Sequence, residues 1–230
     1  MQAVLDNPMW HALQTGDKDK NIGSSTISYY DETIAPFIGM EQWDAVAQQT
    51  LIKNAPADRT WFLLINDIIQ WVEGIEIVMN MPLYQMCCSN LKPSPSTKID
   101  VEIVPLNDSH IEEMVALTAL TKPGPFSNRT IEFGHYHGVF QNGKLVAMGG
   151  ERMHVQNYTE VSAICTHPDF QGLGLAGKVT HFMTQSVLAK GQKPFLHARV
   201  DNIGAIEVYK RLGYDIRETI QFYAFKINNI

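Results

Sequence analysis

Apolar and polar residues follow recognisable periods in several stretches of this 230-residue chain. Residues 60–65 and 75–79 are rich in apolar, β-branched and aromatic side chains, which predicts strands. Residues 43–55 and 82–88 are read as helices. The first part of the chain is therefore expected to be an α/β region, and we identify no site motif in it.

The pattern is clearer from residue 99 onwards. Residues 99–106 alternate as in a strand, and Asn107 or Asp108 then caps a helix over residues 109–121. Asn142-Gly143 lies between two alternating segments, which predicts a hairpin. The further elements expected are a strand, a loop, a helix, a strand, a helix and one or two final strands, over residues 159–166, 167–173, 174–191, 194–200, 203–213 and 214–227.

The periodicity is interrupted at residues 91–98, LKPSPSTK, where two prolines and three serines or threonines replace the apolar positions. This composition is typical of an extended linker. We therefore expect an N-terminal domain over residues 1–91, a linker over 92–98 and a second domain over 99–230.

Composition then narrows the classes of function. The net charge is −6, with 18 Lys and Arg against 24 Asp and Glu, which argues against nucleic acid as a partner. The most apolar window, 61–71, is interrupted by Asn66 and Asp67, so we expect no membrane span, and we read no signal peptide. The three cysteines lack a C-x-x-C spacing, which suggests neither disulfides nor a zinc site and favours the cytoplasm.

Residues 167–178, HPDFQGLGLAGK, contain three overlapping phosphate-binding signatures. A P-loop is disfavoured because Val179 stands where the magnesium of a nucleotide needs a hydroxyl. A dinucleotide fingerprint, G-x-G-x-x-G, is disfavoured because residues 167–171 separate it from the preceding strand and a hairpin precedes that strand. The third signature is Q-x-x-G-x-A, formed by Gln171, Gly174 and Ala176. There, the free N–H groups at the start of a helix would bind a pyrophosphate.

Residues 99–230 resemble the GNAT superfamily of acetyl-coenzyme A dependent N-acetyltransferases. The similarity lies in EVSAICTHP, in QGLGLAGK and in DNIGAIEVYKRLGY, which matches N-x-x-A-x-x-x-Y-x-x-x-G-F except that Tyr214 replaces Phe. The stretches LTALTKPGPFSNRT, GERM and PFLHARVDN look closest to the branch that includes glycine N-acyltransferase-like proteins. The resemblance implies an α+β fold with a mixed, mostly antiparallel central sheet flanked by helices. The N-terminal region would be an α/β extension or a degenerate domain.

The same resemblance implies where acetyl-coenzyme A binds. The strand before the loop would hold the pantetheine through its backbone, and the loop would hold the pyrophosphate. Asn202 would hydrogen-bond the pantetheine or a bound water. The donor-binding residues expected on this basis are Ile164, Cys165, Thr166, Gln171, Gly172, Leu173, Gly174, Leu175, Ala176 and Asn202.

For the catalytic groups, the sequence offers one candidate acid and several candidate bases. By resemblance, Tyr209 is the acid that protonates the departing thiolate, and Glu160 matches the general base of histone-acetylating members. Glu151 and the pair His135 and His137, two apart and hence expected on one face of a strand, are rival bases. A chain of water molecules is a further alternative.

Other residues bear on acceptor binding, on the nucleophile and on metals. Arg129, in the loop 122–130 expected over the acceptor side, could pair with an acceptor carboxylate. Cys165 lacks a base in the sequence, which favours direct transfer over a cysteine nucleophile. His135 and His137 lack a third ligand, so no metal is expected.

The predicted function is transfer of an acetyl group from acetyl-coenzyme A to a primary amine of a small molecule or peptide. The competing class is a non-catalytic module that binds or senses acyl-coenzyme A, and a nicotinamide-dependent oxidoreductase is a third. A homodimer is an additional option, with residues 1–91 as one surface that could form it.

Overall fold

The computed structural model describes residues 3–228 and divides into two compact units. The first unit comprises the residues up to Tyr84, Met153–Gln156 and the residues from Glu218 onward. The second comprises Gln85–Arg152 and Asn157–Arg217. The predicted linker, residues 92–98, lies inside the second unit, and separate folding of residues 1–91 and 99–230 stays a prediction.

The first unit has an aromatic core. Strand β3 pairs antiparallel with β10, from Thr60 opposite Lys226 to Ile65 opposite Gln221. Trp61 and Phe225 are fully buried on this pair. Its helices and strands are η1 (Ala3–Leu5), α1 (Pro8–Gln14), η2 (Lys18–Lys20), β1 (Ser28–Tyr29), β2 (Ile38–Gly39), α2 (Ala45–Asn54), β3 (Thr60–Ile65) and parts of β4 (Ile75–Cys88), β7 (Lys144–Val155) and β10 (Tyr214–Ile227).

A buried carboxylate organises one corner of this first unit. Asp17 is fully buried and accepts hydrogen bonds from the Tyr30 hydroxyl at 2.8 Å and from the His154 backbone N–H at 3.1 Å. Its other oxygen lies 2.7 Å from Nδ1 of His154. Because a buried carboxylate must be compensated, these contacts bind the η2 segment to the end of β7.

The second unit contains the elements of the predicted transferase region. Its strands lie in the order β4-β9-β8-β7-β6-β5, with β10 also beside β4. The pairs β5/β6 and β6/β7 are antiparallel and β8/β9 is parallel. The elements not yet given are β5 (Val104–Pro105), η3 (Asp108–His110), α3 (Ile111–Thr121), η4 (Thr130–Phe133), β6 (His137–Gln141), β8 (Tyr158–Thr166), η5 (Pro168–Phe170), α4 (Leu175–Ala189), β9 (Lys193–Arg199) and α5 (Ile203–Arg211).

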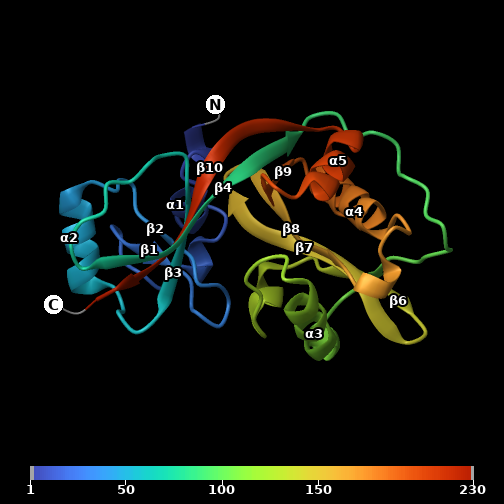
Figure 1. Ribbon diagram of the computed structural model, residues 1–230, viewed down its shortest axis with the longest axis horizontal. Helices are drawn as coiled ribbons and strands as arrows, with labels where there is room; N and C mark the ends of the chain where they lie inside the picture. The colour runs from blue at the N-terminus through green and yellow to red at the C-terminus, as the bar shows by residue number, and fades with distance from the viewer. Residues whose placement is uncertain (1–2, 229–230) are drawn as a thin grey trace. The chain divides into compact units, whose positions relative to one another are not determined.

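Helices cover both faces of this sheet. Both α3 and α4 contact β8, from opposite sides (Figure 1). Val179, Met183 and Val187 of α4 pack on Val146 and Val161 of the sheet. The apolar positions three and four apart in α4 therefore form the helix face that the pattern predicts. The predicted class, α+β with a large and mostly antiparallel sheet flanked by helices, is confirmed.

Most predicted elements are present, and the hairpin turn has the expected backbone. Asn142 and Gly143 both have positive φ, 51° and 75°, as a tight turn between β6 and β7 requires. The helix predicted over residues 82–88 is wrong, because these residues form the end of β4. Leu83, Gln85 and Met86 are all buried, so both faces of this strand are covered and the two-residue alternation is lost.

The strand predicted over residues 99–106 is shorter than expected. Only Val104 and Pro105 pair with β6. Ile99, Val101 and Ile103 still pack on the α4 cluster, which explains the alternation in the sequence. The alternation therefore predicted correctly which side is buried but not the backbone hydrogen bonding.

Candidate active site

Strands β8 and β9 separate in the middle of the sheet. They pair in parallel from Tyr158 opposite Lys193 to Glu160 opposite Phe195, and no further. Strand β8 nevertheless continues to Thr166 and β9 to Arg199. The β9 side of β8 beyond Glu160 is thus a strand edge, which can accept an extended ligand as an added strand does.

A bulge at Ala163 lies where this edge begins. Ala163 has φ of 54°, which is uncommon for a residue other than glycine. Val161 and Ile164 both pack on the α4 cluster although they are three positions apart, which a regular strand does not allow. The bulge therefore shifts the alternation of side chains by one residue after Ala163. It also interrupts the regular backbone hydrogen bonding of the strand at this point.

The phosphate-loop residues lie at the N-terminus of α4, as the sequence predicts. Gly172 and Gly174 have φ of 72° and 86°, values that favour glycine. Gly174 is the N-cap, and no side chain caps the helix. Leu175 is buried in the core, whereas Gln171 is exposed beside the loop. The first N–H groups of this 15-residue helix therefore form an anion-binding arrangement.

Residues 92–98 lie beside the glycine-containing loop that precedes α4. The Lys98 N–H donates to the Leu173 carbonyl at 3.0 Å, and Nζ of Lys178 donates to the Ser94 hydroxyl at 3.0 Å. A Cβ on Gly174 would lie 2.8 Å from the Ser96 carbonyl oxygen. The segment passes α4 and α5 as an extended trace (Figure 1). Its Ser96 carbonyl limits the space around Gly174.

The end of β8 combines a buried thiol with an orphaned hydroxyl. Burial raises the pKa of Cys165 to about 11, so this cysteine is a poor nucleophile near neutral pH. The side-chain oxygen of Thr166 is buried and has no hydrogen-bond partner within residues 3–228. An orphaned oxygen at this place fits a ligand that supplies a hydrogen bond, as an extended pantetheine with its amides would.

Tyr209 lies on α5 and is almost entirely buried. Burial, and then the nearby Cys165, raise the pKa of Tyr209 to about 12, so its hydroxyl keeps its proton. Within the part of the chain that the structure describes, this hydroxyl makes no hydrogen bond. Asn202 caps α5, and its side-chain oxygen accepts from the Ala205 N–H at 3.2 Å. The amide NH2 group of Asn202 and the second lone pair of its oxygen are then the groups that could bind a ligand.

Glu160 is held in a buried row of polar side chains. Arg152 donates from Nε and Nη2 to the two Glu160 oxygens, each at 2.6 Å, and Nδ1 of His197 lies 2.7 Å from Oε1. Gln85 follows, 3.1 Å from Nε2 of His197, and accepts from Arg217 at 2.6 Å. Burial alone would raise the pKa of Glu160, but Arg152 and His197 outweigh it and lower the pKa to about 2.

The rival bases lie elsewhere. Glu151 is buried and pairs with Nζ of Lys190 at 2.6 Å. The His137 ring packs on Phe182 of α4, with ring centroids 4.7 Å apart, and burial lowers the pKa of His137. His135 precedes β6 and has φ of 54°, so the prediction that both histidines share one strand face is wrong.

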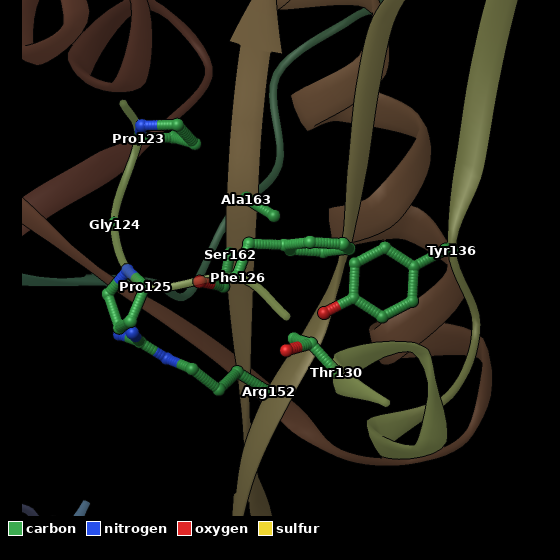
Figure 2. Close-up of a pocket in the computed structure, with 9 residues that line it drawn as sticks. All are labelled: Pro123, Gly124, Pro125, Phe126, Thr130, Tyr136, Arg152, Ser162 and Ala163. Atoms are coloured by element: carbon green, nitrogen blue, oxygen red, sulfur yellow. The ribbon is translucent and has the colours of Figure 1, made fainter. Parts of the chain in front are cut away.

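A pocket opens beside the bulge (Figure 2). Its walls are loop residues between α3 and η4, the first residue of η4, the residue before β6, and residues of β7 and β8. Arg152 extends from its strand toward Pro125, and the Tyr136 ring meets the Phe126 ring edge-on at 5.7 Å. The lining residues are Pro123, Gly124, Pro125, Phe126, Thr130, Tyr136, Arg152, Ser162 and Ala163.

Sequence reasoning missed Tyr136, Arg152 and Ser162 as pocket residues. The alternation along β7 is the signal that could have found Arg152, because it places this residue on the opposite face from Glu151. Arg129 does not line the pocket, since it is exposed and pairs with Glu132 at 2.5 Å. The loop 122–130 does form part of the pocket wall, and its place over an acceptor stays a prediction.

Residues 3–228 contain neither a metal-binding cluster nor a membrane-spanning helix. No group of three or more His, Cys, Asp or Glu side chains there is arranged to hold a metal ion. No helix in the same range is both long and apolar enough to cross a membrane.

Comparisons with known proteins relate this geometry to a family. A family model described as FR47-like protein matches residues 136–223. No curated protein sequence matches the chain. A crystal structure from Novosphingobium aromaticivorans DSM 12444, described as an acetyltransferase of the GNAT family, is 30% identical with a TM-score of 0.87. That match covers 98% of this chain and 99% of that one.

More distant structures share the fold. A GCN5-related N-acetyltransferase from Kribbella flavida is 17% identical, with a TM-score of 0.66 and coverage of 96% of this chain and 95% of that one. A GNAT-family acetyltransferase from Colwellia psychrerythraea is 14% identical, with a TM-score of 0.52 and coverage of 94% and 96%. With the separated strands and the loop before α4, the full-length match at 30% identity leads to one conclusion: the chain belongs to the GNAT family of acetyltransferases, whose donor substrate is acetyl-coenzyme A.

Proposed function

We propose that the protein transfers an acetyl group directly from acetyl-coenzyme A to a primary amine of a small molecule or peptide. One observation carries this proposal. Ala163 forms the bulge where the β8 edge begins, and it also lines the pocket. A donor extended along the edge and an acceptor in the pocket would therefore meet at the same residue.

The donor would be held mainly by backbone. Ile164, Cys165 and Thr166 offer the edge of β8 to the pantetheine, and the residues from Gln171 to Ala176 offer the loop and the start of α4 to the pyrophosphate. Coenzyme A supplies the activated thioester. The positive φ of Gly172 and Gly174 and the orphaned Thr166 oxygen fit this binding mode.

The transfer forms a bond between the amine nitrogen and the acetyl carbon and breaks the bond between that carbon and sulfur. The sulfur leaves with the electron pair, and Tyr209 donates a hydrogen bond and then its proton to it. Because the pKa of Tyr209 is raised to about 12, the phenol keeps its proton at neutral and mildly alkaline pH. The amine nitrogen releases one proton as the amide forms, and the Tyr209 phenolate takes up one proton from water, so the protons balance.

Glu160 is the predicted acceptor of the amine proton, and its surroundings limit that role. A carboxylate with a pKa of about 2 is a weak base, and both of its oxygens are already bound by Arg152 and His197. We therefore favour the alternative that water in the pocket carries the proton away. Glu160 then acts by holding Arg152 at the pocket wall.

Two finer assignments remain part of the proposal. The stretches GERM and PFLHARVDN support placement near glycine N-acyltransferase-like proteins. A cytoplasmic location is supported by the unpaired cysteines. Neither changes the chemistry.

A non-catalytic acyl-coenzyme A binding module is the competing function. The pocket beside Ala163 favours catalysis, because a module that only senses the thioester has no need of an acceptor site. Calorimetry with acetyl-coenzyme A and with NADH tests the donor, and an amine panel with free-thiol detection tests transfer. We expect the thioester to bind, NADH not to bind, and at least one amine to release thiol. Binding of NADH alone would overturn the donor assignment.

A further inference from the structure

The pocket beside Ala163 contains two hydroxyl groups without a partner. Tyr136 and Ser162 both line it, and Tyr136 is buried, with 2% of its surface exposed. Within the part of the chain that the structure describes, neither hydroxyl makes a hydrogen bond. The Tyr136 hydroxyl points into the pocket (Figure 2). Because buried polar groups are normally hydrogen-bonded, this pair indicates a ligand that supplies the missing bonds.

Both hydroxyls are uncharged. Burial raises the pKa of Tyr136 far above its usual range, and the nearby Arg152 offsets only part of this effect. The phenol therefore keeps its proton, as the Ser162 hydroxyl does. A neutral hydroxyl can accept hydrogen bonds as well as donate one. The pair thus suits a polar group that is itself uncharged.

The rest of the pocket disfavours a cationic ligand. None of the described residues that line it is Asp or Glu, and Arg152 adds a positive charge. Glu160 lies behind Arg152, with both of its oxygens bound by Arg152 and His197. An ammonium ion that left water for this pocket would find no carboxylate to compensate its charge. A neutral primary amine has two N–H groups, and the oxygens of Tyr136 and Ser162 can accept both.

The proton chemistry of the site favours the same form of the amine. An ammonium ion must lose a proton to a base before its nitrogen can attack the thioester. Glu160, with a pKa of about 2, is a weak base. An amine that is already neutral has its lone pair free and needs no base before the attack. After the attack its nitrogen is cationic, and water can take the proton.

The walls of the pocket indicate which neutral amine fits. Pro123, Pro125 and Phe126 supply apolar surface, and the Phe126 and Tyr136 rings meet edge-on at 5.7 Å. A further aromatic ring packs well on such a surface. An amino group attached directly to an aromatic ring is weakly basic, because its lone pair is delocalised into the ring. The aryl amine therefore matches both the walls and the hydroxyls.

We propose that the acceptor is a weakly basic aryl amine, bound in its neutral form, with Tyr136 and Ser162 accepting hydrogen bonds from its two N–H groups. This inference rests on the proposed function for the transfer step, whereas binding of the amine can be measured without it. The nitrogen bonds to the acetyl carbon, the sulfur leaves with its electron pair, and the nitrogen gives one proton to water. Alkyl amines that are ammonium ions at neutral pH are disfavoured acceptors.

Binding tests this inference without turnover. The full chain, with coenzyme A present, is titrated at neutral pH with aniline, benzylamine and toluene, and binding is followed by nuclear magnetic resonance. Aniline and benzylamine each have an aromatic ring and a primary amino group, but only benzylamine is an ammonium ion. The wild type should bind aniline on the order of tenfold more tightly than benzylamine. It should also bind aniline about tenfold more tightly than toluene, which lacks the amino group.

Variants assign the preference to the two hydroxyls. Tyr136→Phe and Ser162→Ala should each lower the affinity for aniline about fivefold, and the double variant should bind aniline within about twofold of toluene. Tyr158→Phe is the matched control, because Tyr158 belongs to β8 but does not line the pocket, and it should change nothing. The affinity for acetyl-coenzyme A should stay the same in all variants, which checks that they are folded.

Three results would each overturn the inference. They are benzylamine binding as tightly as aniline, aniline binding no tighter than toluene, and unchanged aniline affinity in both single variants. The proposed function fails separately, if aniline binds as expected but no amine releases thiol from acetyl-coenzyme A. Transfer to alkyl amines alone would leave the proposed function standing and would overturn the inference.

Discussion

The two sides of the candidate active site are built in different ways. On the donor side, the β8 edge and the loop before α4 come from one continuous stretch, residues 158–189. On the acceptor side, the pocket combines a loop before β6 with side chains from β7 and β8. In the proposed function, the donor side would act through backbone groups and the acceptor side through side chains.

This difference explains why the donor side leaves a motif in the sequence and the acceptor side does not. Backbone recognition needs only glycines at positive φ and a helix start, so it leaves a short motif in the sequence. The acceptor side depends on which side chains meet, and its buried row joins Gln85, Arg152, Glu160, His197 and Arg217 from five strands. Five predictions test this contrast, beginning with the largest expected effect.

Glu160→Gln should be the most damaging single change to stability. It leaves Arg152 without its buried counter-ion, and breaking a buried pair costs about 3 to 5 kcal/mol. Chemical denaturation measures this loss. Glu132→Gln, which breaks the exposed pair with Arg129, is the control and should cost less than about 0.5 kcal/mol. Similar losses of unfolding free energy in both variants would mean that the buried row of polar side chains matters no more for stability than an exposed ion pair.

The same carboxylate should make the wild type acid-sensitive. The pKa of Glu160 is lowered from 4.5 to about 2 on folding, so the unfolded state binds more protons in that interval. Stability is then fully present above pH 4.5 and is lost as the pH falls toward 2, by roughly 3 kcal/mol at most. The Glu160→Gln variant should lose less stability across the same pH interval. An identical dependence of unfolding free energy on pH in both proteins would count against the lowered pKa of Glu160.

Gly174→Val should abolish donor binding on the other side. Its Cβ would lie 2.8 Å from the Ser96 carbonyl oxygen, and the φ of 86° strains a β-branched residue. We expect acetyl-coenzyme A affinity to fall on the order of 100-fold, or about 3 kcal/mol, by calorimetry. Gly172→Ala separates the two causes, because it has positive φ but open space, and should cost less. Unchanged affinity in Gly174→Val would place the donor elsewhere.

Tyr209→Phe should change turnover rather than binding. Losing the acid should lower kcat on the order of 10- to 100-fold, while acetyl-coenzyme A affinity stays within about threefold. Thiol release and calorimetry on the same preparation measure the two effects. A parallel loss of affinity and turnover would mean that Tyr209 only shapes the site.

Cys165→Ala should have the smallest effect. The buried thiol, with a pKa of about 11, takes no part in direct transfer, so kcat should stay within about threefold. Steady-state kinetics measure this, with mass spectrometry checking for an acetylated enzyme. Loss of turnover together with an acetyl group on Cys165 in the wild type would instead indicate a cysteine intermediate.

The sequence predicts local features well and contacts between distant side chains poorly. The Asn142-Gly143 turn, α4 and the glycine loop follow from nearby residues and are confirmed. The end of β4 was read as a helix because burial on both faces removes the alternation. Arg152 was overlooked because its role depends on Glu160 and His197, which are 8 and 45 positions away and meet it only in the sheet.

The most direct test of the central claim is a product measurement. The protein is incubated with acetyl-coenzyme A and a panel of amines that includes amino acids, and both free thiol and acetylated acceptor are quantified. Direct transfer predicts one acetylated amine for each thiol released, with no release when Gly174→Val replaces the wild type. Tight binding of acetyl-coenzyme A without thiol release above the spontaneous rate, for every amine, would contradict the account and favour a non-catalytic module.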